Sequence, residues 1–284
     1  MPENVKPESG LYVTATPIGN MADITLRALD ILGKADVILS EDTRVTGKLL
    51  SRHGIKSKLL SYHEHNAARV RPGILARLEA GQIVALVSDA GTPLISDPGF
   101  KLVEEARGIG VMVTSLPGPS AVINALAMAG LPCSRFCFYG FLPARRGQRL
   151  KLLEEVAGAG ATLIFFESTK RLRASLADMK EVFGPERRVA VAREMTKRFE
   201  EVLVKPLDQL TAELEARDSI KGEVTVLVEP AAQKPGRENE VDQALIQALK
   251  HLSVREAASA VAYLTGVKRR QVYARALELK DEAP

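Results

Sequence analysis

The sequence predicts an α/β protein built of two α/β domains and a small helical domain at the C-terminal end. Three observations predict this class. Apolar segments of strand length alternate with segments of helical periodicity from residue 11 to about residue 229. Three of the early apolar segments run into loops rich in Gly and Pro. A linker containing Pro and Gly then precedes a basic segment with helical periodicity.

Length and composition set the domain organisation that we expect. With 284 residues and 46% hydrophobic content, the chain can bury a large core, and this length favours more than one domain. Residues 1–9 are expected to form a flexible tail, residues 10–118 a first α/β domain and residues 119–229 a second one. Residues 230–238 are expected to be a linker, and residues 239–284 a helical domain that binds RNA.

Composition also excludes some classes of protein. No apolar segment approaches the roughly 18 to 20 residues that a membrane span needs, and the N-terminus MPENVKPESG does not have the order of a signal peptide. We therefore expect a cytoplasmic protein without a membrane partner. Cys133 and Cys137 are too few ligands for a structural zinc site, so no metal site is predicted.

In the first domain, strands and helices alternate in short units. The predicted strands lie near 11–15, 36–40, 58–62, 83–87 and 111–115, and the predicted helices at 24–33, 44–53, 73–80 and 100–107. This alternation is typical of βαβ units and predicts a parallel sheet covered by helices.

The second domain continues the alternation and then changes character. Its predicted helices lie at 121–129, 148–156 and 170–182, and its predicted strands at 135–141, 161–166 and 188–192. The last two strands, at 199–204 and 223–228, flank a short helix and look antiparallel. The second sheet is therefore predicted to be mixed.

The C-terminal domain contains two predicted helices, at 254–264 and 268–279, joined by a turn with Gly266. A helix, a glycine turn and a basic helix form the helix-turn-helix pattern. The pattern predicts that Lys268, Arg269 and Arg270 contact RNA. A plain helical hairpin used for dimerisation predicts the same apolar spacing, so this alternative stays open.

The loops after the strands at 11–15, 83–87 and 111–115 give the strongest indication of function. They read TPIGN, SDAGTPLISDPG and SLPGPSA. Proline fixes φ and glycine allows positive φ, so such loops are stiff and leave main-chain groups free for a ligand. Because the carboxyl ends of parallel strands meet at one edge, the loops predict a ligand site there. The nucleotide motifs G-x-G-x-x-G and G-x-x-x-x-G-K-[ST] are absent from the sequence, which disfavours a Rossmann-bound cofactor and P-loop chemistry.

Five segments carry a family resemblance. VTATPIGN, SDAGTPLISDPG, SLPGPSA, FFEST and GEVTVLV occur in the order and spacing of the S-adenosylmethionine-dependent tetrapyrrole methylase superfamily, which the chain resembles from residue 11 to about 229. SEDTRVT, SYHEHN and AREMTK are similar to its RNA-modifying branch, which methylates the ribose 2′-hydroxyl of a decoding-region cytidine in small-subunit ribosomal RNA. The resemblance implies S-adenosylmethionine as cofactor, a cleft between the two α/β domains, ribosomal RNA or the small subunit as partner, and a homodimer.

One motif departs from the superfamily. Where its members usually carry G-D-P, this chain has Gly91, Thr92 and Pro93, and the acidic residues are displaced to Asp89 and Asp97. Carried over by motif, the implied cofactor contacts come from the first-domain loops and from four positions of the second domain. They are Pro17, Gly19, Asp89, Ala90, Gly91, Ile95, Ser96, Pro117, Ser120 and Ala121, with Phe166, Glu167, Arg193 and Gly222.

Methyl transfer to a hydroxyl gains roughly 10² to 10⁴-fold from a nearby base. The candidate catalytic residues are Asp89, Glu167 and Glu194, each next to a predicted strand end. For each, capping a helix or fixing a loop is the structural alternative. Lys197 or Arg193 could instead lower the pKa of the hydroxyl.

Several basic side chains are candidates for RNA contact. Arg44 and Arg171 are predicted in the first turns of helices, where a cation is disfavoured by the helix dipole, so phosphate contact explains them better. The remaining candidates of this kind are His63, Arg145 and Arg146. Two alternative functions stay open, namely a methylase of tetrapyrroles or other small molecules and a noncatalytic RNA-binding assembly factor.

Overall fold

The computed structural model describes residues 7–231 and 237–281. The chain divides into two compact units, residues 1–230 and residues 231–284. Residues 1–6 of the expected tail and residues 232–236 of the expected linker lie outside the described residues. Within the described residues, no helix has the length and apolar character required to cross a membrane.

The first sheet is parallel throughout. It consists of β1 (Gly10–Thr14), β2 (Val37–Ser40), β3 (Leu59–Ser61), β4 (Ile83–Leu86) and β5 (Val113–Leu116), in the order β3-β2-β4-β1-β5. All residues of β1, β2 and β4 are buried, as the continuous apolar runs of these strands require.

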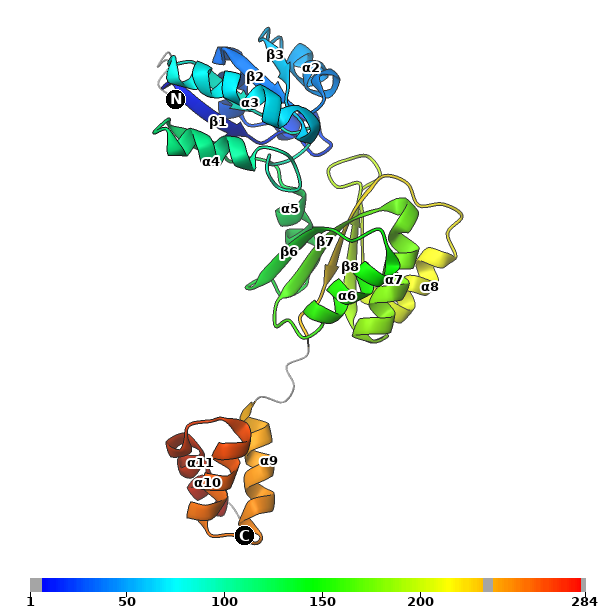
Figure 1. Ribbon diagram of the computed structural model, residues 1–284. Helices are drawn as coiled ribbons and strands as arrows, with labels where there is room; N and C mark the ends of the chain where they lie inside the picture. The colour runs from blue at the N-terminus through cyan, green and yellow to red at the C-terminus, as the bar shows by residue number, and fades with distance from the viewer. Residues whose placement is uncertain (1–6, 232–236, 282–284) are drawn as a thin grey trace. The chain divides into compact units, whose positions relative to one another are not determined.

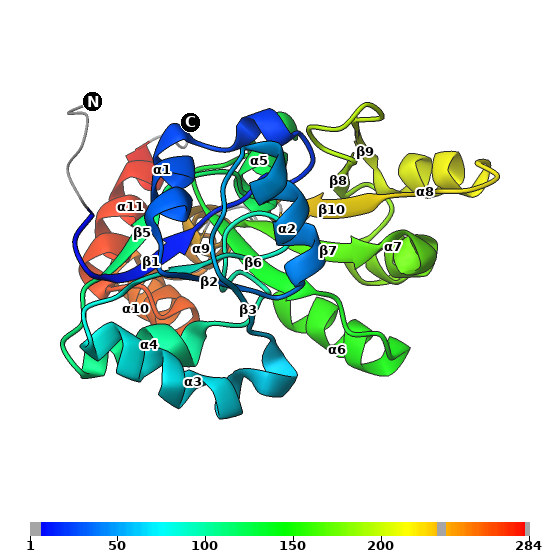
Figure 2. The ribbon, with the colours of Figure 1, turned by 90° about the horizontal axis from the view of Figure 1, so that it is seen from above.

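Helices cover both faces of this sheet, as Figure 2 shows from above. α1 (Leu26–Lys34) and α2 (Thr43–Arg52) pack on one face, where Ile31 and Leu49 share a core with Ala85. α3 (Glu64–Glu79) and α4 (Phe100–Gly108) pack on the other face, where Ile74 shares a core with Val84. Because neighbouring strand residues point to opposite faces, both cores form around the same strand β4.

The helix α3 is longer than the sequence predicts. The predicted helix covers residues 73–80, but α3 begins at Glu64 and contains Pro72. The main-chain N–H of His63 donates to Asn66 Oδ1 at 2.9 Å, which closes the first turn. Ala67 and Val70, both before the proline, pack on the core of this face. Tertiary packing therefore outweighs the local cost of the proline.

The connections around β1 and β4 create the position of the site. The chain leaves β1 through α1 toward β2, and it leaves β4 through α4 toward β5 on the opposite side. β1 and β4 are neighbours, so the chain departs in opposite directions from adjacent strand ends. In open α/β sheets, such a switch point leaves a crevice at the carboxyl ends of the strands, where ligands bind.

The second sheet is mixed, as predicted. It consists of β6 (Phe136–Phe141), β7 (Thr162–Ser168), β8 (Arg188–Arg193), β9 (Glu201–Pro206) and β10 (Glu223–Val228), in the order β6-β7-β10-β8-β9. Only the pair β6 and β7 is parallel. α5 (Ala121–Met128) packs on one face, and α6 (Arg146–Val156), α7 (Thr169–Phe183) and α8 (Leu207–Glu215) on the other. The predicted domain boundary after residue 118 falls between β5 and α5.

A buried ion pair joins α6 to α7. Arg149 Nη2 lies 2.6 Å from Asp178 Oδ2, and both side chains are 5% exposed. Arg146 Nε also donates to Asp178, at 2.9 Å. Arg149 belongs to a basic segment that reads as an exposed helix face in the sequence, but here it is part of the core.

The C-terminal unit is a three-helix bundle of α9 (Arg237–Leu249), α10 (Val254–Thr265) and α11 (Arg269–Asp281), seen in Figure 1. Leu245, Val261 and Val272 are buried between the helices, one from each. Gly266 ends α10 in the left-handed conformation, with φ of 69°. The helix α9 begins inside the segment that we expected to be a linker, and it was not predicted as a separate helix.

Candidate active site

Hydrogen bonds connect the loops after β1, β4 and β5 along one edge of the first sheet. The main chains of Thr16 and Gly91 exchange two hydrogen bonds, of 2.9 and 3.0 Å, and Thr16 Oγ1 donates to the carbonyl of Ser88 at 3.0 Å. Thr92 Oγ1 donates to the carbonyl of Pro119 at 3.1 Å. Gly91 adopts φ of 78°, which favours glycine. These bonds fix the relative positions of the three loops.

A cavity of about 650 Å³ lies at this edge. It is bounded by the loops after β4 and β5, by the end of β7 with the first turn of α7, and by the start of β10. Ten of the fourteen predicted cofactor residues line it, and their contact with a cofactor stays a prediction. These ten are Asp89, Ala90, Gly91, Ile95, Ser96, Ser120, Ala121, Phe166, Glu167 and Gly222.

The same cavity includes residues that the sequence analysis did not select. Ser168 and Thr169 belong to the segment FFEST and Glu223, Val224 and Thr225 to GEVTVLV, so the motifs pointed to their neighbourhood. Ile18, Thr92, Asp97 and Met195 also lie in quoted motifs but were not selected, and nothing in the sequence indicated the last two lining residues, Phe141 and Lys170.

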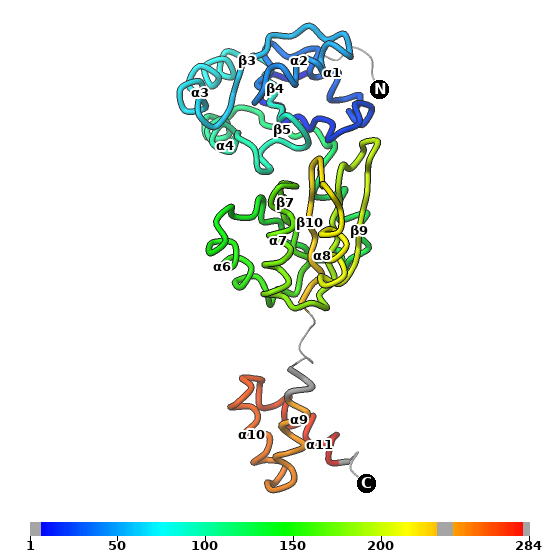
Figure 3. The backbone as a smooth tube through the Cα atoms, turned by 90° about the vertical axis from the view of Figure 1, so that its right-hand side faces the viewer, coloured from blue at the N-terminus to red at the C-terminus, as the bar shows by residue number. Residues whose placement is uncertain are grey.

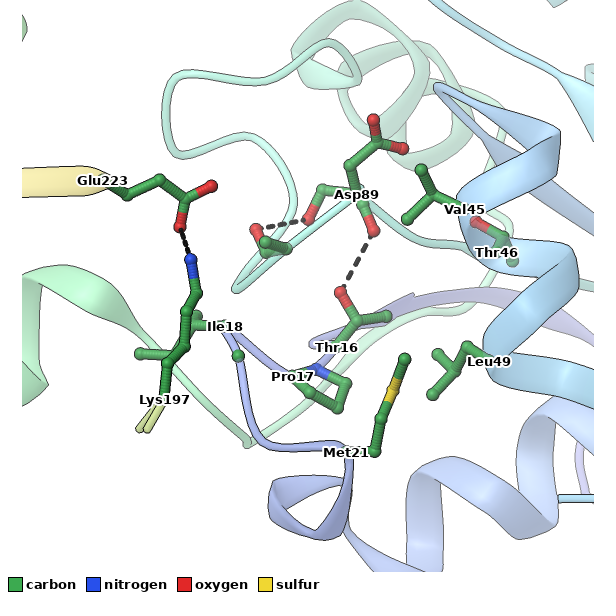
Figure 4. A pocket seen from close by; sticks show the side chains of 13 residues that line it. Thr16, Pro17, Ile18, Met21, Val45, Thr46, Leu49, Asp89, Lys197 and Glu223 are labelled. Carbon is green, nitrogen blue, oxygen red and sulfur yellow. Dashed lines mark hydrogen bonds and ion pairs between the residues drawn. The ribbon is translucent and has the colours of Figure 1, made fainter. Parts of the chain in front are cut away.

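A second, smaller cavity of about 190 Å³ lies beside the first. Figure 4 shows it between Val45, Thr46 and Leu49 on one side and Lys197 and Glu223 on the other. The predicted residues Pro17 and Gly19 line this cavity and not the larger one. The two cavities share four lining residues, which are Ile18, Asp89, Ala90 and Glu223.

Two of the predicted cofactor residues line neither cavity. Pro117 is exposed in the loop after β5. Arg193 donates from Nε to Glu201 Oε2 at 3.1 Å and from Nη1 to the carbonyl of Lys221 at 3.1 Å. The structure therefore gives Arg193 two partners, Glu201 and Lys221, that line neither cavity.

Glu167 is buried at the wall of the larger cavity, with 2% exposure. Its carboxylate lies 2.6 Å from Arg171 Nη2 and accepts hydrogen bonds from Ser168 N at 2.7 Å and Ser175 Oγ at 2.5 Å. Three donors hold this carboxylate in one orientation. Such a network fits the structural alternative for Glu167 better than a free base.

Glu194 lies in the turn between β8 and β9, where it binds Lys197. Lys197 Nζ donates to Glu194 Oε1 and to Glu223 Oε2, each at 2.9 Å. The hydrogen bond from Lys197 lowers the pKa of Glu194. Burial lowers the pKa of Lys197, but the hydrogen bonds to the two carboxylates outweigh burial and raise it. Lys197 is therefore a fixed cation in the wall of the smaller cavity.

Two glycines allow this turn to approach its neighbours, and Figure 3 shows the turn between β8 and β9 at the end of the second sheet. A Cβ atom at Gly19 would lie 2.5 Å from Lys197 Cγ, and one at Gly222 would lie 2.3 Å from Glu194 Oε1. The main-chain N–H of Asn20 donates to Thr196 Oγ1 at 2.9 Å. The glycines that the resemblance implied as cofactor contacts therefore also have a steric role.

Backbone strain is concentrated at the cavities. Within the described ranges, four non-glycine residues have positive φ, and they lie in two loops. Leu94 and Ser96 flank Ile95 in the loop after β4, and Glu194 and Thr196 flank Met195 in the turn between β8 and β9. Both Ile95 and Met195 line the larger cavity. Such conformations persist where the surrounding structure enforces them, which is typical of binding sites.

Two acidic side chains of the site differ in environment. Asp89 Oδ1 accepts a hydrogen bond from the main-chain N–H of Asp42 at 3.0 Å, and the residue lines both cavities. Asp97 lines the larger cavity only. Burial, followed by the negative charge of Glu41, raises the pKa of Asp97 to about 6. Asp97 belongs to the motif SDAGTPLISDPG but was not among the predicted site residues.

The predicted RNA contacts lie in different surroundings. The Arg44 side chain is 87% exposed and forms an ion pair with Asp42 at 2.6 Å. Arg171 and Arg146 are occupied by ion pairs with Glu167 and Asp178, and Arg145 is exposed. His63 precedes α3 and is half-buried. The remaining three candidates, Lys268, Arg269 and Arg270, are exposed at the start of α11.

Known proteins are similar to this chain in sequence. Residues 10–211 match the family of tetrapyrrole (corrin/porphyrin) methylases, and residues 235–280 match the RsmI C-terminal HTH domain. The chain is 49% identical to the ribosomal RNA small subunit methyltransferase I of Mesorhizobium japonicum, over 96% of this chain and 93% of that protein. It is 45% identical to the protein of the same name from Escherichia coli O157:H7, over 94% of each chain.

Solved structures share the fold at lower identity. Uroporphyrin-III-C-methyltransferase from Thermus thermophilus matches with a TM-score of 0.56 at 20% identity, over 78% of this chain and 95% of that one. A cobalt precorrin-4 methyltransferase matches with a TM-score of 0.59 at 19% identity, over 77% and 94%. The chain therefore belongs to the tetrapyrrole (corrin/porphyrin) methylase family, in the group of the ribosomal RNA small subunit methyltransferases I.

Proposed function

We propose that this protein transfers a methyl group from S-adenosylmethionine to the ribose 2′-hydroxyl of a decoding-region cytidine in small-subunit ribosomal RNA. The observation that carries the proposal is the cavity of about 650 Å³ at the switch point of a parallel sheet, lined by ten residues of the methylase motifs. The relatives named as ribosomal RNA small subunit methyltransferase I support the same acceptor.

The size and the charged groups of the larger cavity fit this cofactor. Its volume lies within the roughly 300 to 1,000 Å³ of small-molecule sites. Four carboxylates and one ammonium line it, so the wall favours the cationic sulfonium and amino groups. Lys170, in the first turn of α7, lies where main-chain N–H groups are unpaired, and it suits the cofactor carboxylate. When bound, the cofactor supplies an electrophilic sulfonium methyl group.

Positioning is the main contribution of the chain. Holding an acceptor oxygen in line with a methyl group can supply roughly 7 to 11 kcal/mol in ideal cases. The hydrogen bonds of Thr16, Gly91 and Thr92 fix the loops before any ligand binds. The loops therefore need little further ordering when the cofactor and the acceptor bind.

The acceptor oxygen forms a bond to the methyl carbon while the bond from that carbon to sulfur breaks and its electron pair stays on sulfur. The hydroxyl proton needs a base. Glu167 and Glu194 are both held by donors of the protein. Asp89 lies in the wall shared by the two cavities and has one oxygen bound to Asp42 N. We infer that Asp89 takes the proton, and that Glu167 and Glu194 position the wall.

The acceptor RNA requires cationic surfaces. Lys268, Arg269 and Arg270 are exposed on α11, and they suit phosphate contacts of the ribosomal RNA. Arg44 is exposed beside Val45 of the smaller cavity. Because its substrate is ribosomal RNA, we expect the protein to act in the cytoplasm.

We also propose that the protein is a homodimer. The helix α5 leaves Ile123 53% and Met128 36% exposed, and it packs on one face of the second sheet. A second copy would remove this apolar surface from water. Sedimentation velocity of the purified chain tests the proposal, since a monomer at micromolar concentration would contradict it. Ile123→Lys is expected to produce the monomer.

Methyl transfer is tested with labelled S-adenosylmethionine and small ribosomal subunits from a strain lacking the modification. Label is expected in 2′-O-methylcytidine after nuclease digestion, in an alkali-resistant linkage. Label on a base, or on an added porphyrinoid only, would refute the ribose assignment. A protein that binds RNA but transfers no label would instead support a noncatalytic assembly factor.

A further inference from the structure

We infer that the smaller cavity, of about 190 Å³, is the acceptor pocket, and that it receives a single cytidine turned out of the RNA chain. The inference rests on the proposed methyl transfer and names the place where the acceptor nucleotide binds. Four observations support it, and they concern the shared wall, the size of the pocket, its chemistry and its rim.

The shared wall sets the distance between acceptor and donor. The two cavities share four lining residues, Ile18, Asp89, Ala90 and Glu223. The wall between a ligand in the smaller cavity and a ligand in the larger cavity is therefore only one residue thick at these positions. Direct methyl transfer requires that the reacting atoms approach to about 3 to 3.5 Å. A pocket adjoining the cofactor cavity satisfies this requirement, whereas an acceptor bound only on the outer surface would not.

The size of the pocket selects a small planar ligand. Its volume is less than a third of that of the cofactor cavity, about 190 against 650 Å³. A tetrapyrrole macrocycle is far larger than one nucleobase, so it does not fit this pocket. Enzymes that modify a nucleotide within RNA or DNA hold it in a close-fitting pocket outside the base stack.

The pocket has an apolar wall for one face of a base. Met21 and Pro17 lie beside Leu49 of α2, and Val45 lies on the same helix, as Figure 4 shows. Apolar side chains of this kind stack against a flipped base. The polar lining is concentrated at Thr46, Asp89, Lys197 and Glu223.

Lys197 provides a fixed donor for the ligand. An ammonium group has three N–H donors. Two are used on Glu194 and Glu223, each at 2.9 Å, and within the described part of the chain no partner is found for the third. Cytosine offers a carbonyl acceptor, to which the third N–H of Lys197 can donate. The Asp89 oxygen that does not bind Asp42 N stays available for the hydroxyl proton.

The rim of the pocket suits an RNA strand. Val45 is 39% exposed, so the pocket reaches the surface along α2. The preceding residue, Arg44, has an 87% exposed side chain. A cytidine that enters past Val45 would place its flanking phosphates near this guanidinium. Both residues belong to the segment SEDTRVT.

The test fills the pocket without changing the cofactor cavity. Val45 lines only the smaller cavity. We expect Val45→Phe to lower kcat/KM for transfer to unmodified small subunits about 10 to 100-fold, because the added ring occupies the space of the base. Its dissociation constant for S-adenosylmethionine, measured by calorimetry, is expected to stay within about two-fold of wild type. The matched control Ile109→Phe adds the same ring to an aliphatic residue that is 43% exposed and lines neither cavity, and it is expected to transfer methyl groups at close to the wild-type rate.

A second variant tests the donor. Lys197→Met is expected to lower kcat/KM about ten-fold or more, the loss of a charged hydrogen bond. Thermal melting checks that each variant is folded. The acceptor pocket is refuted if folded Val45→Phe transfers methyl groups like wild type, or if it loses cofactor binding in parallel, since the cavity would then belong to the cofactor.

Failure of the proposed function gives a different result. In that case the wild-type chain itself transfers no label to any RNA. Direct binding of cytidine 5′-monophosphate, measured in the presence of S-adenosylhomocysteine, then still tests the pocket. Binding by wild type and Ile109→Phe but not by Val45→Phe supports a nucleotide site, and equal binding by all three overturns it.

Discussion

Glu167 offers a sharp test of how the cofactor wall is built. The change Glu167→Gln keeps the size of a side chain that is 2% exposed but removes its charge. In the native structure the carboxylate accepts from Ser168 N and Ser175 Oγ and lies 2.6 Å from Arg171. A glutamine has only one oxygen to accept with, so its amide group must face a donor.

The expected loss follows from these contacts. A hydrogen bond to a charged group contributes about 1.5 to 3 kcal/mol, and removing one partner of a buried ion pair costs about 3 to 5 kcal/mol. The Arg171 side chain is 30% exposed and can regain water, which places the loss nearer the lower range. We expect a decrease in the free energy of unfolding of about 1.5 to 3 kcal/mol. For a chain of this size, this corresponds to a fall in Tm of roughly 3 to 12 °C.

Urea unfolding and methyl transfer are measured on the same preparation. Because Glu167 holds the wall and does not take a proton, the folded variant is expected to keep kcat within about ten-fold. Ser175→Ala is the matched control, since Ser175 is buried and contacts the same carboxylate but lines neither cavity. Unchanged stability together with a roughly 10² to 10⁴-fold loss of kcat would show that Glu167 is a general base and refute the reasoning.

Three further predictions concern charge. Burial and the charge of Glu41 raise the pKa of Asp97 to about 6. Because the ionised carboxylate attracts a cation, affinity for S-adenosylmethionine, measured by calorimetry, should rise as pH increases through about 6. The variant Asp97→Asn should show no such rise. Asp178→Asn leaves Arg149 buried without its charged partner, so urea unfolding should show a loss of about 3 to 5 kcal/mol, and a loss below about 1 kcal/mol would contradict a buried pair. Replacing Lys268, Arg269 and Arg270 by Gln should reduce the steepness of the plot of log RNA affinity against log salt concentration by up to about 2 to 3. The control Arg275→Gln should leave this slope unchanged, because the charge of Arg275 is paired with Asp242 and Glu278. Equal slopes in all variants would exclude phosphate contact by the three residues.

Local sequence patterns were sufficient for the first sheet. Its strands are short apolar runs, three of them with Gly and Pro after them, and this pattern depends little on the rest of the chain. The pattern failed at α3, which was predicted only from residue 73, whereas packing of Ala67 and Val70 extends the helix back through Pro72 to Glu64. It also missed α9, although Val241 and Leu245 are spaced for one apolar helix face.

The site was predictable where one loop carries it and not where several elements meet. The glycines and prolines of the loop after β4 indicated a ligand site directly. The smaller cavity instead requires the face of α2 with Val45 and the turn that carries Lys197, which are about 150 residues apart in sequence. A fixed cation such as Lys197 becomes visible only when Glu194 and Glu223 are seen on either side of it.

In this protein the larger cavity lies at an edge that the fold itself provides, whereas the smaller cavity belongs to the features that select the acceptor. Structures at 19 and 20% identity share its fold, so the edge that carries the cofactor loops does not by itself define an acceptor. Acceptor choice must then come from what adjoins that edge. Here the adjoining features are a pocket too small for a macrocycle, an exposed arginine at its rim and a basic helix in a separate unit. All three favour a nucleotide within RNA, and a substitution that enlarges the pocket alone, such as Leu49→Ala, should therefore not create activity on a tetrapyrrole.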